Sequence, residues 1–333
     1  MRQRMKSPNG AQLTTGQRDQ KGQAVMGLWG GIRWDFSSVG GTGAAQAMDF
    51  VKMHGLGNDF VMLNCLEQQI PEAELPALAV RLCDRHFGVG ADGIELILPS
   101  DKADFRMRIF NADGSEAEMC GNGIRCFAKY LHDYGLTDKD ILRIETLAGI
   151  QVVEVRKNSG GVESVRVDMG EPRLKPEDIP IALPNLSFQP LEKVVNQSLT
   201  VNGQTFAITC VSMGNPHCVI FLEEVDHFPF QTIGPQIETH PVFPLRTNVH
   251  FAQVLSATEV KVKVWERGAG PTLACGTGAC AVLVAGALTG QLERRAVVQL
   301  PGGALLVEWA ENNHLLMTGP ATTVFVGTIF ESH

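Results

Sequence analysis

The chain has 333 residues, of which 44% are hydrophobic and 19% are charged, and its formal net charge is −8 at pH 7. This length allows two domains, and the negative balance, with no basic patch, argues against nucleic acid or an anionic membrane surface as a partner. The longest apolar run, residues 279–288, is too short to cross a membrane.

Residues 1–47 differ from the rest of the chain and are predicted to be an N-terminal extension. They are rich in Gly, Gln, Ser and Arg, with six Lys and Arg against two Asp and Glu. Three interpretations stay open: a disordered tail, a transit peptide, or sequence upstream of a true start at Met48. We expect a cytoplasmic protein, or a plastid protein if the extension is a transit peptide.

From Met48 the chain alternates short strand-like runs with a few helices. The first predicted strand, FVML, is followed by a helix over LPALAVRLCDRHFG that ends at Gly88. FRMRIFN, residues 105–111, alternates as a strand does. Apolar residues after Cys120 follow helical spacing until Gly135 ends that helix. Strands are then predicted at GIQVVEVR and VESVRVDM, before a proline-rich connection at 172–190.

The second half contains a strand and a helix of unusual clarity. Residues 259–268, EVKVKVWERG, read as a clear alternating strand that delivers Glu266 and Arg267 to its far end. The helix after Cys275 is apolar on nearly every face, so we expect it to be buried within its domain.

Eight cysteines are spread along the chain without any CxxC pair. That spacing makes a structural zinc site improbable and predicts no bound metal. With no secretory signal peptide before them, free thiols in a reducing compartment are the better interpretation.

Two cysteine-headed glycine turns, MCGNGIRCFAKYL and ACGTGACAVLVAGAL, lie 155 residues apart. Two Gly-Asn pairs that run into apolar strands precede them. Asn58 lies 62 residues before Cys120, and Asn215 lies 60 residues before Cys275. Two landmarks in the same order with nearly equal spacing predict an internal duplication of about 155 residues.

A cysteine at the start of a helix, beside glycines, can form an anion site with a reactive thiol. The first N–H groups of the helix are unpaired and carry partial positive charge, which suits a carboxylate and lowers the pKa of a thiol. Two such turns facing each other could take a proton from one face of a carbon and return one to the other. Each turn alone could equally be structural. A nucleotide site is poorly supported, because neither turn has the Lys-Ser/Thr of a P-loop.

The stretches HGLGNDF, FNADGSEAEMCGNGIRCFAKY, SMGNPHCV, RTNVHF and WERGAGPTLACGTGACA together resemble the diaminopimelate epimerase family. The resemblance runs from about Asp49 to the C-terminus. It implies interconversion of LL- and meso-2,6-diaminopimelate in lysine and cell-wall biosynthesis, without pyridoxal phosphate or metal. It also implies an isomerase with a small-molecule substrate, no other cofactor and a homodimer.

The resemblance implies that Cys120 and Cys275 are the catalytic pair, with Cys120 as base in the LL-to-meso direction and Cys275 as acid. The residues expected to hold the α-carboxylate are Gly121, Asn122, Gly276 and Thr277. The polar contacts expected mostly at the distal end are Asn58, Asn111, Asn215, Asn248 and Arg267. Glu266 is expected near the substrate ammonium and Cys275, and His217 near the thiols.

Residue chemistry supports these roles independently. Arg267 can bind a carboxylate bidentately, and each asparagine offers donors and an acceptor. Plainer interpretations remain for single residues: an asparagine in a turn, a core histidine at 217, and a surface ion pair for Glu266 and Arg267. Two positions depart from the family pattern. Gly93 stands where glutamine is common, which puts one substrate contact in doubt, and Pro271 stands where Glu is common.

The fold class implied by the resemblance is α+β, with two pseudo-twofold-related domains that each wrap a mixed β-sheet around a central helix. The predicted N-terminal domain spans residues 48–164 with a returning strand at 322–333, and the C-terminal domain spans 165–321. The substrate cleft would lie between them.

Other classes of function stay open at this point. A proline-type amino-acid racemase could use the same two thiols on the same fold, but it does not need polar contacts for a distal amino-acid end. A thiol redox switch is a further alternative, and it does not require the paired asparagines. A non-catalytic amino-acid binding protein is another, and it would tolerate loss of both thiols.

Overall fold

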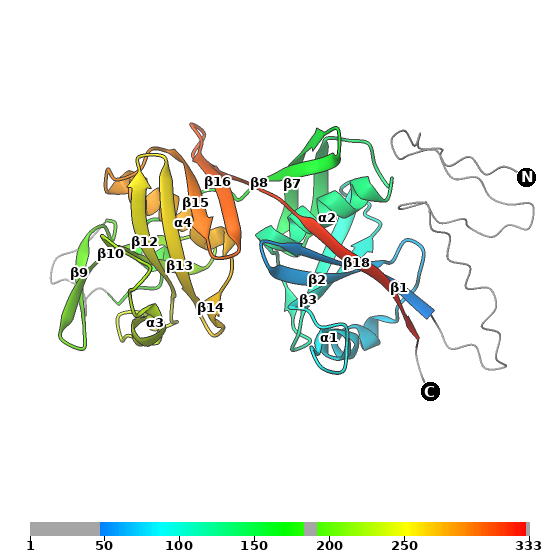
Figure 1. The fold of residues 1–333 in the computed structure, drawn as a ribbon, viewed down its shortest axis with the longest axis horizontal. Coiled ribbons are helices and arrows are strands. Elements are labelled where there is room, and N and C mark those ends of the chain that lie inside the picture. The colour runs from blue at the N-terminus through cyan, green and yellow to red at the C-terminus, as the bar shows by residue number, and fades with distance from the viewer. Residues whose placement is uncertain (1–46, 183–191, 331–333) are drawn as a thin grey trace, which may run out of the picture. The chain divides into compact units, whose positions relative to one another are not determined.

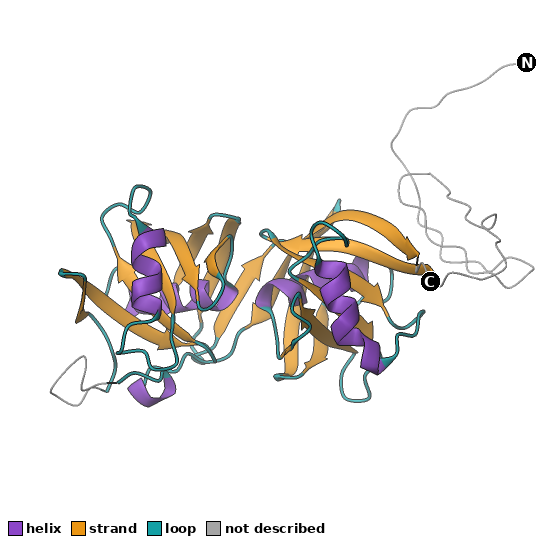
Figure 2. Ribbon diagram, turned by 90° about the horizontal axis from the view of Figure 1, so that it is seen from below, coloured by secondary structure: helices purple, strands orange, loops and turns teal. Residues whose placement is uncertain are grey.

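Two long helices, each enclosed by strands, form the centre of the fold (Figures 1 and 2). The computed structural model describes residues 47–182 and 192–330. The predicted extension therefore lies outside the described residues except for Ala47, and part of the predicted proline-rich connection also lies outside them.

The N-terminal half, as named here, runs from β1 to β8. Its elements are β1 (Ala47–Gly55), β2 (Asn58–Asn64), a 3-10 turn (Glu72–Glu74), α1 (Leu75–Cys83), β3 (Gly93–Leu98), β4 (Phe105–Asn111), β5 (Glu116–Ala117), α2 (Gly121–Asp133), β6 (Ile141–Thr146), β7 (Gly149–Asn158) and β8 (Gly161–Asp168).

The C-terminal half, as named here, runs from β9 to β17. After a 3-10 turn (Pro176–Asp178), its elements are β9 (Gln197–Val201), β10 (Gln204–Ser212), β11 (Pro216–Phe221), α3 (Phe230–Glu238), β12 (Asn248–Ser256), β13 (Glu259–Glu266), β14 (Gly270–Thr272), α4 (Gly276–Leu288), β15 (Arg295–Leu300), β16 (Gly303–Trp309) and β17 (Leu315–Gly319), and β18 (Thr322–Phe330) follows.

Strand pairing repeats between the halves. In the first, β1 pairs antiparallel with β2, β2 parallel with β3, β3 antiparallel with β4, β4 parallel with β6, and β6, β7 and β8 follow antiparallel. The same sequence of pairings recurs from β10 to β17. The repeat confirms the predicted duplication and the α+β fold class.

Two further pairings connect the halves. β17 lies antiparallel to β8, and β18 returns to lie antiparallel to β1, from Ala47 opposite Phe330 to His54 opposite Thr322 (Figure 1). The predicted return of the last strand is thus confirmed. The domain boundaries at 164/165 and 321/322 stay a prediction.

The predicted helix over 75–88 is too long by five residues, because α1 ends at Cys83. Asp84 leaves the helical conformation with ψ 124°, and its Oδ1 accepts hydrogen bonds from the backbone N–H groups of His86 and Phe87. An aspartate that binds the backbone two and three residues ahead competes with helical hydrogen bonds. This local turn ends the helix before Gly88.

The prediction that the helix after Cys275 is buried is confirmed. From Gly276 to Gly286 every residue of α4 except Thr277 is buried. α2 and α4 contribute to one apolar cluster, whereas α1 and α3 cover separate clusters. Full burial of a side chain such as Phe127 or Leu283 contributes about 1.5–3 kcal/mol to folding. The starts of α2 and α4 are therefore held on rigid, well-packed elements.

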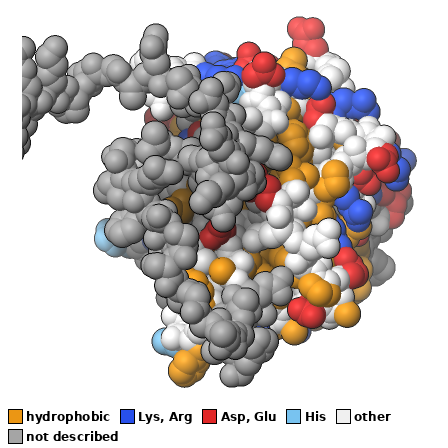
Figure 3. Space-filling model, turned by 90° about the vertical axis from the view of Figure 1, so that its right-hand side faces the viewer, with side chains coloured by type: hydrophobic (Ala, Val, Ile, Leu, Met, Phe, Trp, Pro, Cys, Tyr) orange, Lys and Arg blue, Asp and Glu red, His pale blue; other side chains and the backbone are white. Residues whose placement is uncertain are grey.

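Among the described residues, no helix has both the length and the apolar character needed to cross a membrane. On the face drawn in Figure 3, acidic, basic and hydrophobic side chains of the described residues are intermingled.

Candidate active site

Cys120 and Cys275 occupy equivalent positions immediately before α2 and α4. Both have extended backbones, with φ/ψ of −135°/120° and −129°/107°, and the carbonyl of each accepts the first helical hydrogen bond. The Cys120 Sγ also accepts a hydrogen bond from the N–H of Gly123 at 3.5 Å. Each cysteine is thus the N-cap residue of its helix, at the positive end, and the Cys120 side chain also makes a capping hydrogen bond.

The two helix starts lie next to each other. A methyl group placed on Gly276 would lie 3.9 Å from the Cα of Gly121, and one side chain, Met317, contacts both glycines. Asn122 Nδ2 donates to the carbonyl of Ala274 at 3.5 Å across the same junction. The unpaired N–H groups of two helices therefore converge on one place, as an anion site requires.

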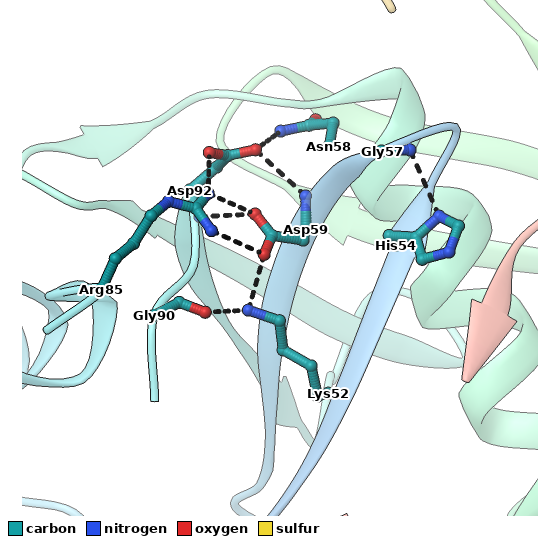
Figure 4. Close-up of polar contacts among 8 residues, drawn as sticks. All are labelled: Lys52, His54, Gly57, Asn58, Asp59, Arg85, Gly90 and Asp92. Atoms are coloured by element: carbon teal, nitrogen blue, oxygen red, sulfur yellow. Dashed lines mark hydrogen bonds and ion pairs between the residues drawn. The ribbon is translucent and has the colours of Figure 1, made fainter. Parts of the chain in front are cut away.

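Asn58 contacts Cys120 directly. Its Oδ1 accepts from the Cys120 thiol at 3.5 Å and from Asn122 Nδ2 at 3.2 Å. Its own Nδ2 donates to Asp92 Oδ2 at 2.8 Å, which fixes the orientation of the amide (Figure 4). The predicted site residues Asn58, Cys120 and Asn122 are thus brought together.

A charged cluster missed by sequence reasoning holds Asp92 in place (Figure 4). Arg85 bridges Asp92 and Asp59, each at 2.8 Å, and Lys52 pairs with Asp59 at 2.7 Å. Burial alone would raise the pKa of Asp59, but hydrogen bonds from Arg85 and Lys52 lower it to about 2. Asp59 therefore stays ionised at neutral pH, and the cluster anchors the end of β2 that carries Asn58.

A hydrogen-bonded chain leads to Cys275. The Cys275 Sγ lies 3.6 Å from Thr277 Oγ1, Asn215 Nδ2 donates to that hydroxyl at 3.3 Å, and His217 Nε2 lies 2.9 Å from Asn215 Oδ1. His217 Nδ1 lies 2.9 Å from Nε2 of His250, a buried residue that sequence reasoning did not select.

The acceptor atoms determine which group donates in each hydrogen bond of this series. Asn215 Oδ1 can only accept, so His217 carries its proton on Nε2 and accepts from His250 on Nδ1. Burial lowers the pKa of His250 to about 3 and that of His217 well below its usual value, so both rings are neutral. Because Thr277 already accepts from Asn215, its hydroxyl proton is free to point to the sulfur of Cys275.

Glu266 lies beside Cys275. Burial raises the pKa of the Glu266 carboxyl, while hydrogen bonds with Thr272 and Cys275 act to lower it. In turn, burial first and the charge of Glu266 second raise the pKa of Cys275 well above its usual value.

The expectation that the helix starts lower the thiol pKa values is wrong for this structure. Burial raises the pKa of Cys120 to about 11, although backbone N–H groups of Gly123 and Asn122 act to lower it. Cys275 shifts in the same direction. Loss of hydration of the thiolate outweighs the helix N-terminus, because both sulfurs are enclosed by the packed start of a helix.

The remaining predicted contacts fall into two places. Asn248 Oδ1 accepts from the backbone N–H of Arg267 at 3.0 Å, and the exposed Arg267 guanidinium donates to the carbonyl of Leu245. Asn111 is exposed at the end of β4, where its Nδ2 donates to Ser115. In the described part of the chain, the Asn111 side chain makes no hydrogen bond to the other predicted site residues.

The structure gives a steric reason for one of the two departures from the family pattern and a location for the other. Gly93 pairs with Asn111, and a Cβ at Gly93 would lie 2.7 Å from the carbonyl oxygen of Phe110, so a side chain there would require the strand to shift. Pro271 lies in the short strand β14 opposite Trp265, outside the two cysteine turns.

The fold itself defines a class. The structure superposes on that of a hydroxyproline epimerase from Agrobacterium vitis with a TM-score of 0.60 over 85% of this chain and 92% of that one, at 14% identity, which establishes a shared α+β fold.

The sequence identifies the family within that class. Residues 50–175 and 209–324 match the model of the family described as diaminopimelate epimerase. The chain is 56% identical over 280 residues to a diaminopimelate epimerase of Pelotomaculum thermopropionicum, covering 84% of this chain and 98% of that protein. It is 54% identical over 284 residues to one of Acetivibrio thermocellus, covering 85% and 98%. The chain belongs to the diaminopimelate epimerase family and is an isomerase.

Proposed function

We propose that this enzyme converts LL-2,6-diaminopimelate to meso-diaminopimelate in lysine biosynthesis, with Cys120 and Cys275 as the two acid/base groups. The observation that carries the proposal is the meeting of two cysteine-capped helix starts, with Gly121 and Gly276 in near contact. The family relatives named for this activity supply the substrate.

The α-carboxylate of the substrate would bind where the two helix starts converge. Backbone N–H groups at Gly121, Asn122, Gly276 and Thr277 would hold it, and they would stabilise the negative charge that develops as the α-proton leaves. The α-carbon would then lie between the two sulfurs.

In the LL-to-meso direction the Cys120 thiolate takes the α-proton and becomes a thiol. The Cys275 thiol donates its proton to the opposite face of the carbon and becomes a thiolate, so the configuration inverts and the proton count balances. The raised pKa of Cys120 favours abstraction once its thiolate has formed, because a thiolate with a higher pKa is a stronger base towards a weak carbon acid.

The distal end of the substrate carries a second carboxylate and a second ammonium. Arg267, held through its backbone by Asn248, is suited to that carboxylate. Asn58, Asn111 and Asn215 would supply further polar contacts. A distal amino-acid end distinguishes this substrate from proline-like amino acids.

Location and assembly form part of the same proposal. The eight cysteines, all among the described residues, are free thiols, which supports the reducing cytoplasm. Val324, Val326 and Phe330 expose apolar side chains along β18, which supports a homodimer. The net charge of −8 supports the absence of nucleic-acid and anionic-membrane partners. No cofactor is needed, because side chains and backbone supply the proton transfer.

The test is incubation of the purified full chain with LL-diaminopimelate in deuterium oxide, followed by NMR. We expect meso product that carries deuterium at the α-carbon. Cys120→Ser and Cys275→Ser should each lose most turnover while keeping the circular dichroism of the parent, and Cys65→Ser, remote in sequence from both turns, is the matched control. Absence of α-deuterium in the reduced parent protein would refute the proposal.

A further inference from the structure

Glu95 is a fully buried carboxyl group that the proposed mechanism does not use. Among residues 47–182 and 192–330, four buried side-chain N or O atoms lack a hydrogen-bond partner, and both Glu95 carboxyl oxygens are among them. In β3 this residue lies between Met62 of β2 and Ile109 of β4. An unpartnered buried acid is costly to folding, so its retention calls for a physical account.

The carboxyl group of Glu95 lies beneath the first turn of α2. A methyl group on Gly123 would overlap Glu95 Oε1, so the carboxyl lies directly against the backbone of Gly123. The N–H of that same glycine donates to the Cys120 sulfur. Glu95 is therefore in contact with the turn that carries the candidate base.

The groups that act electrostatically on Cys120 are few. Arg125 and Cys126 belong to α2 and Glu95 to β3, while the paired residues of β2 and β4 are apolar. Arg125 favours the Cys120 thiolate, whereas ionised Glu95 opposes it. Burial raises the pKa of Glu95 to about 8, so the group is mostly neutral at pH 7.

The duplicated half has a titratable side chain at the equivalent place. His250 lies 155 residues after Glu95, the spacing that also separates Gly123 from Gly278 and Cys120 from Cys275. A methyl group on Gly278 would overlap the His250 ring, and His250 Nδ1 is another of the four unpartnered atoms. The fold thus places one buried titratable group beneath each cysteine turn.

We propose that Glu95 is a positioning residue that controls the ionisation of Cys120: as a neutral acid it permits the thiolate, and as a carboxylate it suppresses it. As the pH rises, ionisation of Glu95 then opposes formation of the Cys120 thiolate, although Glu95 does not contact the substrate. The consequence for turnover rests on the proposed function, but the effect on the thiol does not.

The test is the rate of iodoacetamide alkylation of Cys120 between pH 6.5 and 9.5, in the full chain and in Glu95→Gln. Only the thiolate reacts. Trypsin cuts after Arg125 and places Cys120 and Cys126 in separate peptides for mass spectrometry. We expect equal rates at pH 6.5, where Glu95 is neutral. At pH 9.5 the variant should react about tenfold faster, because a nearby like charge shifts a pKa by about one unit.

Two further variants keep the outcome decisive. Glu95→Leu also removes the ionisable group and should show the same pH-dependent ratio if the amide of Glu95→Gln disturbs the core. Glu145→Gln, a change of the same type in β6, should alkylate like the parent at every pH, and Cys275 serves as the internal reference. A ratio of variant to parent alkylation rates that does not vary with pH in the folded variants would overturn the inference. A purely structural role of Glu95 would change the alkylation rate by the same factor at every pH. That result would leave the deuterium-exchange test untouched.

Discussion

Replacing Glu95 by glutamine should make the protein more stable, and increasingly so as the pH rises. The folded protein holds the Glu95 proton up to a pKa of about 8, whereas in the unfolded chain the group has its ordinary value of 4.5. Between these values the folded state binds more protons than the unfolded state. Stability therefore falls as the pH rises from 4.5 to 8, and the loss is constant above that range.

The magnitude follows from the two pKa values. One unit corresponds to about 1.4 kcal/mol, so the destabilisation caused by Glu95 is about 1 kcal/mol at pH 5, about 3 kcal/mol at pH 7 and about 4 kcal/mol at pH 8. Glutamine has nearly the same shape as the protonated acid and does not ionise. The gain in free energy of unfolding from Glu95→Gln should therefore grow by about 3 kcal/mol between pH 5 and pH 8.

Urea unfolding followed by circular dichroism at pH 5, 6, 7 and 8 measures this gain. The denaturation midpoint of Glu95→Gln should separate progressively from that of the parent, with similar slopes. Glu145→Gln is the control, because Glu145 bonds to Ser100 near the surface and its pKa is lowered, not raised. Parallel pH dependence of the parent and Glu95→Gln would show that the carboxyl ionises normally in the folded protein and would refute the reasoning.

Two other predictions concern the thiol site. His250→Gln should reduce the loss of stability on acidification, because the pKa of His250 in the folded protein is lowered to about 3. The contribution of the neutral His250 ring to the free energy of unfolding is complete above pH 6.5. It declines as the pH falls, by about 2 kcal/mol at pH 5. Urea midpoints of the parent and the variant at pH 5 and pH 7.5 check this. The same drop in midpoint between the two pH values in both proteins would contradict it. Oxidation should join Cys120 to Cys275 and abolish turnover reversibly, because their helix starts are adjacent. Peptide mapping before and after dithiothreitol tests the linkage, and full activity of the cross-linked protein would exclude a two-thiol mechanism.

The duplication and the paired cysteine turns could be predicted because they depend on local signals. Glycines after Cys120 and Cys275, and the apolar helix behind each, are visible in the chain itself. The same is true of the alternating strand that ends at Glu266.

What could not be predicted depends on contacts between distant segments. Glu95 lies in GIELIL, where a single charge in an apolar run gives no sign that a helix start will cover it. Asp59 and Asp92 meet because β2 lies parallel to β3, and Arg85 reaches them only through the turn that ends α1. The direction of the thiol pKa shifts could not be predicted from the sequence either. Burial raises the pKa of a thiol and the helix N-terminus lowers it, and only the packing around the sulfur decides which effect is larger.

The two halves of the site have the same backbone but opposite electrostatics. Buried Arg125 donates to the carbonyls of Gly121 and Pro320 and places a positive charge near Cys120, while Glu95 at neutral pH adds no negative one. Cys275 instead faces Glu266, whose charge raises the pKa of that thiol. Both thiols have raised pKa values, but the thiolate is opposed by fewer neighbouring charges at Cys120 than at Cys275, which agrees with the proposed abstraction by Cys120 in the LL-to-meso direction. Divergence of the buried neighbours, with the duplicated turns unchanged, is sufficient to give two equivalently placed thiols different electrostatic surroundings.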